Sequence, residues 1–299
     1  MDILRSKQVN TDITEHGLTE QANIGSKLRK PPSGSAEDGL LAVRGEVKSR
    51  KSKVEGPEGW FLPIGLLRDG ARELGIELDG TQVDRLDRFA ATLVETNRSF
   101  NLTRITEPAE IVTGHYLDSL ACLAAYEISK GARVIDVGTG AGFPGIPIKI
   151  ARPDIELTLL DASRKKLKFI ERAADEIDIE VRLVHARAED AGRDPVHREA
   201  YDAAVTRALA DMKTLVELCL PLVKVGGVLI ANKSEDVDAE IDAARPIIGQ
   251  LGGRIDEIVS VTIPHTDITR RLVVVSRTRP TPPEFPRPYA KIARKRRTQ

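Results

Sequence analysis

The chain has 299 residues, of which 41% are hydrophobic and 30% are charged, and its basic and acidic residues balance to a net charge of zero. This composition is typical of a globular protein with room for one large domain and an appendage. The first residues contain no apolar segment typical of a secretory signal, and no run of about 18 apolar residues occurs. We therefore expect a cytoplasmic protein with no membrane partner.

Cysteine and histidine usage gives no sign of metal or covalent chemistry. Cys122 and Cys219 lie in apolar helical patterns without a C-x-x-C partner, and the five histidines are scattered. Cysteines in such patterns are usually core residues. The sequence therefore predicts no metal site and no catalytic side chain, and we expect a monomer.

The net charge of zero conceals an uneven distribution. Residues 270–299 contain ten basic residues and one acidic residue, whereas residues 1–55 contain ten basic and eight acidic residues. The middle of the chain is therefore acidic. A basic tail on an acidic body is typical of a protein with a polyanionic partner, and a merely solvated tail is the alternative.

The chain before residue 131 divides into two parts. Residues 1–55 have little periodic hydrophobicity and contain the run PPSGS, so we predict a disordered extension. Residues 56–130 show apolar residues three and four apart, which predicts a small helical cap. Its last helix is expected over Glu107 to Tyr126, following a break at 97–106. The polar residues of this cap are interpreted as capping and packing groups: Asn101, His115 and Asp118.

The stretch ARVIDVGTGAGFPG, residues 132–145, organises the rest of the chain. A short β-branched run predicts a buried parallel strand, and Pro144 suits the first turn of a following helix. Glycines permit positive φ and close approach of another molecule to the backbone. Four of them follow the strand: Gly138, Gly140, Gly142 and Gly145. A strand, a glycine turn and a helix N-terminus predict a site for a nucleotide-like ligand.

Asp136 decides which kind of nucleotide we expect. The spacing G-x-G-x-x-G alone also fits a nicotinamide dinucleotide. A carboxylate at the tip of the strand is unfavourable beside a pyrophosphate. It suits a ligand that has no phosphates and carries a positive amino or sulfonium group. S-adenosylmethionine is such a ligand, so Asp136 favours it over NAD.

Strands and helices alternate after the glycine turn, which predicts a doubly wound, mostly parallel sheet over residues 131–279. The last two strands are joined by a loop too short for a crossover helix, so we expect them to pair antiparallel. The seven strands are expected at 134–137, 155–160, 180–184, 201–206, 227–232, 255–263 and 272–276.

Ligands of such sheets bind outside the carboxyl ends of the strands. Asp161 ends the second strand, about 20 residues after the glycines, and is placed to bind ribose hydroxyls. Ala188 and Glu189 follow the third strand and are candidates for contacting adenine. Arg207 follows the fourth strand and is interpreted either as a ligand contact or as the ion-pair partner of Asp136 or Glu189.

Five motifs in order resemble those of the ribosomal RNA small-subunit methyltransferase G family: NLTRI…HYLDSL, IDVGTGAGFPGIP, LLDAS-RKK, RAED and TRALA. The resemblance covers about residues 60 to 285. It implies a Rossmann-like class I S-adenosylmethionine-dependent methyltransferase fold, with a seven-stranded sheet. It also implies methylation of N7 of a guanine in 16S rRNA, on the RNA or a small-subunit precursor. The implied cofactor residues are Gly138, Phe143, Ala188, Glu189 and Arg207, supported by Asp136, Gly140 and Asp161.

The implied chemistry agrees with the lack of an evident base. Guanine N7 carries an exposed lone pair and needs no deprotonation, so transfer requires mainly alignment. The prolines of the segment 280–299 predict an extended arm that follows RNA phosphates. Its candidate contacts are Arg287, Lys291, Arg294, Lys295, Arg296 and Arg297. The alternatives are a methyltransferase for a small molecule or another RNA, and a nicotinamide-dependent dehydrogenase.

Overall fold

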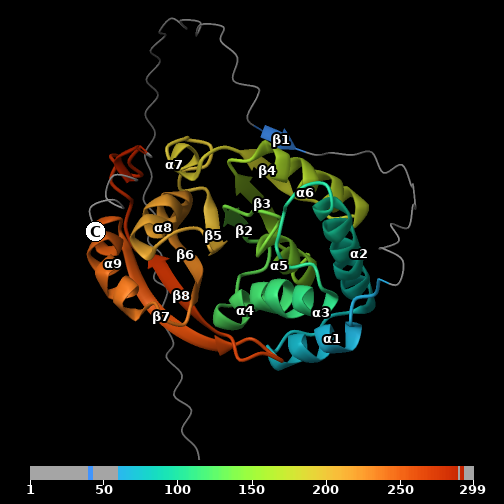
Figure 1. Cartoon of the computed structure of the whole chain (residues 1–299). Coiled ribbons are helices and arrows are strands. Elements are labelled where there is room, and N and C mark those ends of the chain that lie inside the picture. The colour runs from blue at the N-terminus through green and yellow to red at the C-terminus, as the bar shows by residue number, and fades with distance from the viewer. Residues whose placement is uncertain (1–39, 43–59, 289, 293–299) are drawn as a thin grey trace, which may run out of the picture. The chain divides into compact units, whose positions relative to one another are not determined.

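A computed structural model of the chain describes residues 40–42, 60–288 and 290–292, which all lie in one compact unit spanning residues 37–299. Within these residues one sheet of eight strands organises the fold (Figure 1). The strands are β1 (Leu40–Ala42), β2 (Arg133–Val137), β3 (Glu156–Asp161), β4 (Arg182–His185), β5 (Tyr201–Arg207), β6 (Val223–Ser234), β7 (Gly253–Thr262) and β8 (Thr269–Arg277).

The strand order across the sheet is β1-β4-β3-β2-β5-β6-β8-β7. Strands β2 to β6 are mutually parallel, and the chain winds outward from β2 in both directions. This confirms the predicted doubly wound sheet of seven strands, β2 to β8. The last two strands pair antiparallel as predicted, and β8 lies between β6 and β7. The additional strand β1 pairs antiparallel with β4 and falls within 1–55; the rest of that predicted extension lies outside the described residues.

Helices cover both faces of the sheet. They are α1 (Ile64–Glu73), α2 (Gly80–Asn97), α3 (Pro108–Glu110), the π-helix η1 (Ile111–Leu117), α4 (Asp118–Ala125), α5 (Gly145–Ala151), α6 (Arg164–Glu176), α7 (Ala188–Ala191), α8 (Met212–Cys219), the 3₁₀ turn η2 (Leu220–Leu222) and α9 (Asp238–Gln250). In Figure 1, α8 and α9 lie on one side of the sheet, and α2, α4 and α5 on the other. In the ranges given above, no helix is long and apolar enough to cross a membrane.

The two faces bury two separate hydrophobic clusters. Neighbouring residues of a strand point to opposite faces. Val134 accordingly packs with α2, α4, α5 and α6, and Ile135 packs with α8 and α9. Cys122 and Cys219 are both buried, one in each cluster, which confirms that they are core residues.

The helices that precede β2 share the first of these clusters. Phe89 of α2 is fully buried, and its ring lies 5.6 Å from that of Phe143 and 6.1 Å from that of Phe169, measured between centroids. The predicted boundary between a cap over 56–130 and a domain over 131–279 stays a prediction, and in the structure both stretches contribute to one core.

The predicted helix over Glu107 to Tyr126 is present but is not uniformly α-helical. It begins with Pro108, passes through the π-helix η1, and continues as α4. At the end of η1 the amide of Asp118 donates to the carbonyl of Thr113, five residues earlier. This turn contains one residue more than a turn of α-helix. Hydrophobic periodicity alone does not distinguish such a π-helical turn from a regular α-helix.

The segment after β8 lies against the rest of the unit. The guanidinium of Arg198 donates to the carbonyls of Thr281 and Phe285, at 2.8 and 2.7 Å. Phe285 and Ile292 are buried. Residues 280–288 form no helix, as the prolines predict, but they do not form a free extended arm, because the amide of Phe285 closes a turn with the carbonyl of Pro282 and Phe285 is buried. Residues 290–292 form a helical turn. Residues 294–297 lie outside the described residues.

Candidate functional site

The glycine turn between β2 and α5 uses its glycines in different ways. A Cβ on Gly142 would lie 2.7 Å from Ile146, and one on Gly145 would lie 2.5 Å from Leu159. These two glycines therefore allow close packing inside the protein. Gly140 has a φ of +61°, and the nearest atom to a Cβ there is 4.0 Å away. The space above Gly140 is open, so this backbone is the part of the turn that a ligand can approach.

Asp136, near the end of β2, is completely buried beneath this turn. Its Oδ2 accepts hydrogen bonds from the Thr139 hydroxyl at 2.7 Å and the Gly145 amide at 2.8 Å. Its Oδ1 is buried and has no hydrogen-bond partner. Burial raises the pKa of this carboxyl from 3.8 to about 7, although both hydrogen bonds favour the charged form. Asp136 thus holds the turn in shape, and its second oxygen is a buried acceptor without a hydrogen-bond partner.

Asp161 ends β3 beside the same turn, as predicted. Its Oδ2 accepts from the Gly140 amide at 2.9 Å, and its Oδ1 accepts from the Ser163 amide at 2.7 Å. A carboxylate has about four acceptor positions, so this partly exposed group keeps capacity for ribose hydroxyls. The proposed ribose contact stays a prediction.

Ala188 and Glu189 form the first residues of α7, directly after β4. Glu189 is only 4% exposed, and its Oε1 accepts from the Nε atom of Arg187 at 2.6 Å. Ala188 is partly exposed. Their predicted contact with adenine stays a prediction. The structure shows that they occupy the expected position after a neighbouring parallel strand.

Phe143, at the end of the glycine turn, packs against the helix that precedes β2. Its ring stacks on that of His115, with 4.2 Å between centroids and an angle of 12° between planes. The guanidinium of Arg207 lies 5.3 Å from the same ring. Tyr116 is fully buried nearby and donates to the carbonyl of Leu86 at 2.6 Å. Aromatic packing therefore fixes the end of the turn.

Arg207 ends β5 and binds a carboxylate other than the two that the sequence suggested. Its Nη1 donates to Asp118 Oδ2 and to the carbonyl of Gly114, both at 2.9 Å. The expected ion pair with Asp136 or Glu189 is therefore absent among the hydrogen bonds and ion pairs of the described residues, and Asp118 takes that role. A contact between Arg207 and a ligand stays a prediction.

Asp118 is the centre of a buried polar group that we call the Asp118 cluster: Asp118, Arg207, Asn232 and Arg270. The carboxylate is 2% exposed. Arg270 from β8 donates to both of its oxygens, at 2.9 and 3.1 Å, and Asn232 from β6 donates to Oδ1 at 3.0 Å. The cluster joins α4 to three strands at the edge of the sheet where the parallel strands end.

This cluster is the main feature that the sequence did not reveal. The sequence suggests capping and packing roles for His115 and Asp118, whereas in the structure Asp118 forms ion pairs with two arginines. A signal was present, because a charged residue inside the apolar run YLDSLACLA requires a buried partner. The partners themselves could not be inferred, since they lie 89, 114 and 152 residues along the chain.

His115 lies beside the cluster as a neutral imidazole. Burial, followed by the charge of Arg207, lowers the pKa of His115 from 6.5 to about 3. Arginine only donates, so Nδ1 accepts from Arg207 Nη2 at 3.2 Å, and the proton is on Nε2, which donates to the Thr103 hydroxyl at 2.8 Å. Both ring nitrogens are therefore occupied by the protein itself.

The candidate RNA contacts of the tail are only partly described. The guanidinium of Arg287 binds the carboxylate of Glu217, with an Nε–Oε1 distance of 2.8 Å, and Glu217 is 1% exposed. Lys291 is exposed. Arg287 thus already has a buried partner, and its contact with RNA stays a prediction, as do those of Lys291, Arg294, Lys295, Arg296 and Arg297.

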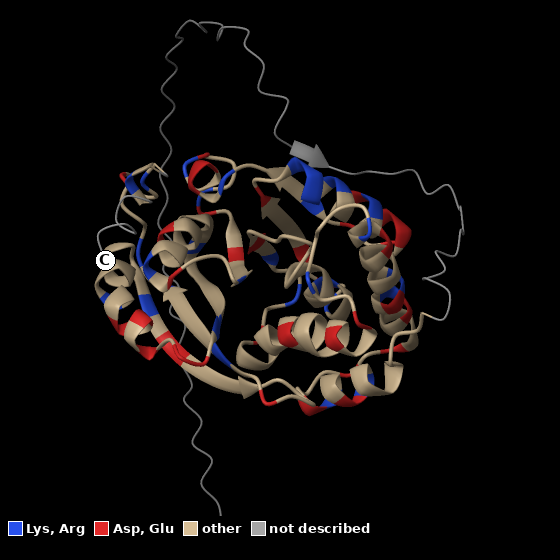
Figure 2. Ribbon diagram, in the orientation of Figure 1, with Lys and Arg blue, Asp and Glu red and all other residues tan. Residues whose placement is uncertain are grey.

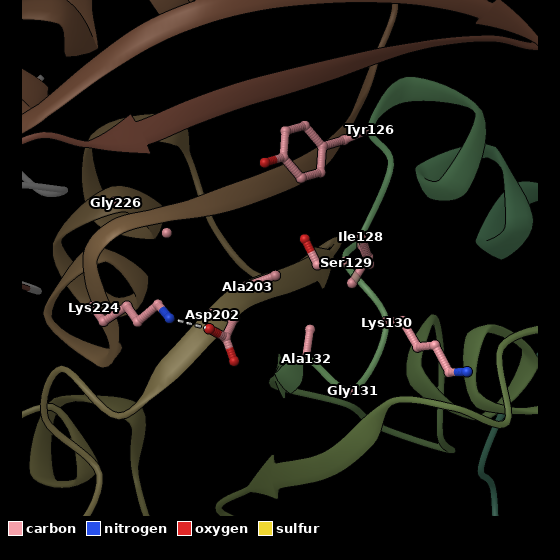
Figure 3. A pocket seen from close by; sticks show the side chains of 11 residues that line it. Tyr126, Ile128, Ser129, Lys130, Gly131, Ala132, Asp202, Ala203, Lys224 and Gly226 are labelled. Carbon is pink, nitrogen blue, oxygen red and sulfur yellow. Dashed lines mark ion pairs between the residues drawn. The ribbon is translucent and has the colours of Figure 1, made fainter. Parts of the chain in front are cut away.

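A pocket of about 250 Å³ lies at the opposite edge of the sheet (Figure 3). It is bordered by the residues leading into β2 and by Lys224 and Asp202, which form an ion pair. Ligands of doubly wound sheets bind at the carboxyl ends of the strands, so this pocket is not the candidate site. Residues 40–42, 60–288 and 290–292 contain no group of three metal-ligating side chains that could hold an ion.

A doubly wound sheet, an open glycine turn and acidic residues at the ends of the first two parallel strands define a Rossmann-like protein of the class I methyltransferase type. Residues 82–268 match the profile of the family described as rRNA small subunit methyltransferase G. The chain belongs to this family.

Curated relatives agree with this assignment. A "Ribosomal RNA small subunit methyltransferase G" of Alkaliphilus metalliredigens is 44% identical over 223 residues, which cover 74% of this chain and 93% of the relative. The protein of the same name from Pelotomaculum thermopropionicum is 42% identical over 222 residues, with coverages of 74% and 93%. Among solved structures, M. jannaschii TYW2 in complex with AdoMet is 12% identical, with a TM-score of 0.41 over 51% of this chain and 72% of that chain. Those last values are too low to support an inference about ligand or activity.

Proposed function

We propose that this protein transfers a methyl group from S-adenosylmethionine to N7 of a guanine in 16S ribosomal RNA. The observation that carries the proposal is the family match, which spans residues 82–268 and so includes every residue of the candidate cofactor site. A 16S rRNA substrate also supports the cytoplasmic location expected from the sequence. The partner is the 16S rRNA itself or a small-subunit precursor that contains it.

The chemistry of the site supports the cofactor. Asp136 has a buried oxygen without a partner, Gly140 has open space above its backbone, and Asp161 has spare acceptor positions. A sulfonium cofactor supplies an already activated methyl group. Asp161 would hold the ribose, Ala188 and Glu189 the adenine, and the glycine turn with Phe143 the methionine part. The remaining members of the set are Asp136, Gly138 and Arg207.

The protein's own contribution to the reaction is alignment. Guanine N7 has a free lone pair, so no side chain needs to remove a proton before transfer. The state of His115 supports this reading, because it is neutral near pH 7 and both of its nitrogens are engaged. Phe143 belongs to the turn itself but is only 6% exposed and stacked on His115, and Tyr116 is fully buried in the core.

Methyl transfer to defined substrates tests the proposal. Purified protein and labelled S-adenosylmethionine are incubated with 16S rRNA, with small ribosomal subunits and with a pool of small metabolites. We expect label in RNA, released as 7-methylguanosine on digestion, and no transfer when 7-deazaguanine occupies the modified position. Label confined to small molecules, or retained on the deaza RNA, would overturn the proposal. Turnover with NAD in place of the methyl donor would support a dehydrogenase instead.

A further inference from the structure

Six basic side chains gather where α2 ends and α6 begins. We call this surface the basic rim: Arg98, Arg104, Arg164, Lys165, Lys166 and Lys168. All are exposed except Lys166, which is partly exposed. The two segments that carry them, 98–106 and 162–170, contain no acidic residue. Figure 2 shows the basic residues of α6 along the part of the helix nearer β1.

The charges of the basic rim are not neutralised by the protein. None of the six side chains forms an ion pair or a hydrogen bond with another residue in the described ranges, and Lys165 alone makes a charge contact, with the ring of Phe100. Elsewhere, basic side chains commonly have partners, such as Arg172 with Glu95 and Glu176. The basic rim is therefore a surface of unpaired positive charge.

The basic residues near the N-terminus of α6 do not stabilise the helix. Cations are unfavourable at the positive N-terminal end of a helix and anions at its C-terminal end. α6 has four of its five basic residues in its first half and all three of its acidic residues in its second half, with no acid in the first turn and no base in the last. Each such placement costs about 0.3–1 kcal/mol, and like charges at Arg164 and Lys168, four residues apart, add to that. The stability of α6 does not explain the charges, whereas binding of an anion does.

The basic rim is built onto the candidate site. Asn97 holds the loop after α2, since its Oδ1 accepts from the amides of Leu102 and Thr103 at 2.7 and 3.0 Å. Thr103 in turn bonds His115, which stacks on Phe143. Lys165 ties the loop to α6, with its Nζ 3.7 Å from the centre of the Phe100 ring.

The other segment of the basic rim begins just as close to the site. Asp161 accepts from the amide of Ser163, which is the N-cap of α6. The basic rim therefore continues directly from the residues expected to hold the cofactor.

We propose that the basic rim binds the phosphate backbone of the RNA beside the target nucleotide. This inference rests on the proposed function, which supplies a polyanionic substrate at this edge of the sheet. Charge complementarity favours a run of phosphates over any neutral partner. The described cations of the C-terminal segment are less suited, because Arg287 and Arg277 are bonded to Glu217 and Glu199. Among the described residues, the basic rim is thus a larger group of unpaired cations than the C-terminal segment, where Lys291 is exposed and has no ion-pair partner.

The test compares two triple variants with the same change of net charge. The first is Arg104→Gln, Arg164→Gln and Lys168→Gln, which leaves the packing of Lys165 on Phe100 intact. The control is Lys130→Gln, Arg245→Gln and Arg254→Gln, which replaces exposed cations away from the basic rim. Binding of a 16S rRNA fragment containing the modified site is measured over a range of salt concentrations, and cofactor binding is measured by calorimetry.

We expect the basic-rim variant to lower the slope of log K against log salt by roughly 2–3 units, since each lost phosphate contact removes about 0.7–0.9. Its affinity for cofactor should equal that of the wild type, which shows that it is folded. The control variant should keep the wild-type slope. Equal slopes in the wild type and the basic-rim variant would overturn this inference. Methylation of RNA by the wild type would then still support the proposed function. A wild-type protein that neither binds nor methylates RNA would overturn both.

Discussion

Two carboxylates, Asp136 and Asp118, are buried at the same edge of the sheet with opposite sets of partners. Asp118 has both oxygens bonded, to two guanidinium groups and an amide. Asp136 accepts only from a hydroxyl and a backbone amide, and one of its oxygens has no partner. Burial alone therefore does not define the role of an acidic residue. Asp118 is neutralised within the fold, whereas Asp136 keeps a buried acceptor oxygen without a partner beneath the turn.

The comparison predicts that removing Asp118 has the largest effect on stability. Asp118→Ala leaves Arg207 and Arg270, which are 15% and 26% exposed, without their shared counter-charge. Breaking a buried ion pair by removing one partner costs about 3–5 kcal/mol. Urea unfolding measures the loss, and Asp69→Ala, which removes an exposed partner of Arg72, is the matched control with a change below about 0.5 kcal/mol. An equally small change for Asp118→Ala would mean that the cluster contributes little to stability.

Asp136 should instead make the stability depend on pH. Its pKa is about 7 in the folded chain against 3.8 as the ordinary value, so between these values the folded chain holds a proton that the unfolded chain has released. Stability therefore falls as pH rises through this window and levels off above pH 7. At 1.36 kcal/mol per pH unit, the fall between pH 5 and 7.5 is roughly 2–3 kcal/mol. Asp136→Asn removes this contribution, so the difference in stability between variant and wild type should change by that amount; a constant difference would contradict the assignment.

A third carboxylate sharpens the comparison, because Asp161 is only partly buried and is bonded to two backbone amides. Asp161→Ala should weaken cofactor binding by roughly 1–3 kcal/mol, since charged hydrogen bonds to the ligand are lost and Gly140 is no longer held. Titration calorimetry with S-adenosylmethionine measures the change. Asp175→Ala, on the exposed part of α6, is the control and should bind normally. Unchanged affinity in Asp161→Ala would remove this residue from the site.

The smallest change in the free energy of unfolding is expected from Arg287→Gln, which removes the guanidinium bonded to the buried carboxylate of Glu217. In the variant the backbone amide of residue 287 still donates to Glu217 Oε1, so the buried carboxylate keeps a partner. The loss of stability should therefore be near the lower limit of about 1.5–3 kcal/mol, the contribution of a hydrogen bond to a charged group. Because this arginine is already paired, its loss should lower stability and leave the salt dependence of RNA binding unchanged. A slope lower by about one unit would instead support the RNA contact predicted from the sequence.

The order of strands and helices, and the position of residues at strand ends, could be predicted because both depend on local pattern. The alternation of strands and helices predicts a doubly wound sheet. The position of Asp161 beside the glycine turn follows from its spacing, because one helix and one strand separate it from the glycines. The partner of Arg207 could not be predicted in the same way. Hydrophobic periodicity gives the face on which a residue lies, but it does not specify which polar groups meet across that face.

The contacts of Arg207 require a fixed number of residues in the π-helix η1. Arg207 is bonded on one side to the carbonyl of Gly114 and to His115, and on the other to Asp118, and these contacts flank the end of η1. Deleting one residue there would rotate everything before it by about 100° relative to Asp118. Arg207 could then bond either to Gly114 and His115 or to Asp118, but not to all three. The contacts of Arg207 therefore depend on the number of residues in this helix, and an insertion or deletion between 111 and 117 would disturb them together with the core residues Ile111, Val112, Tyr116 and Leu117.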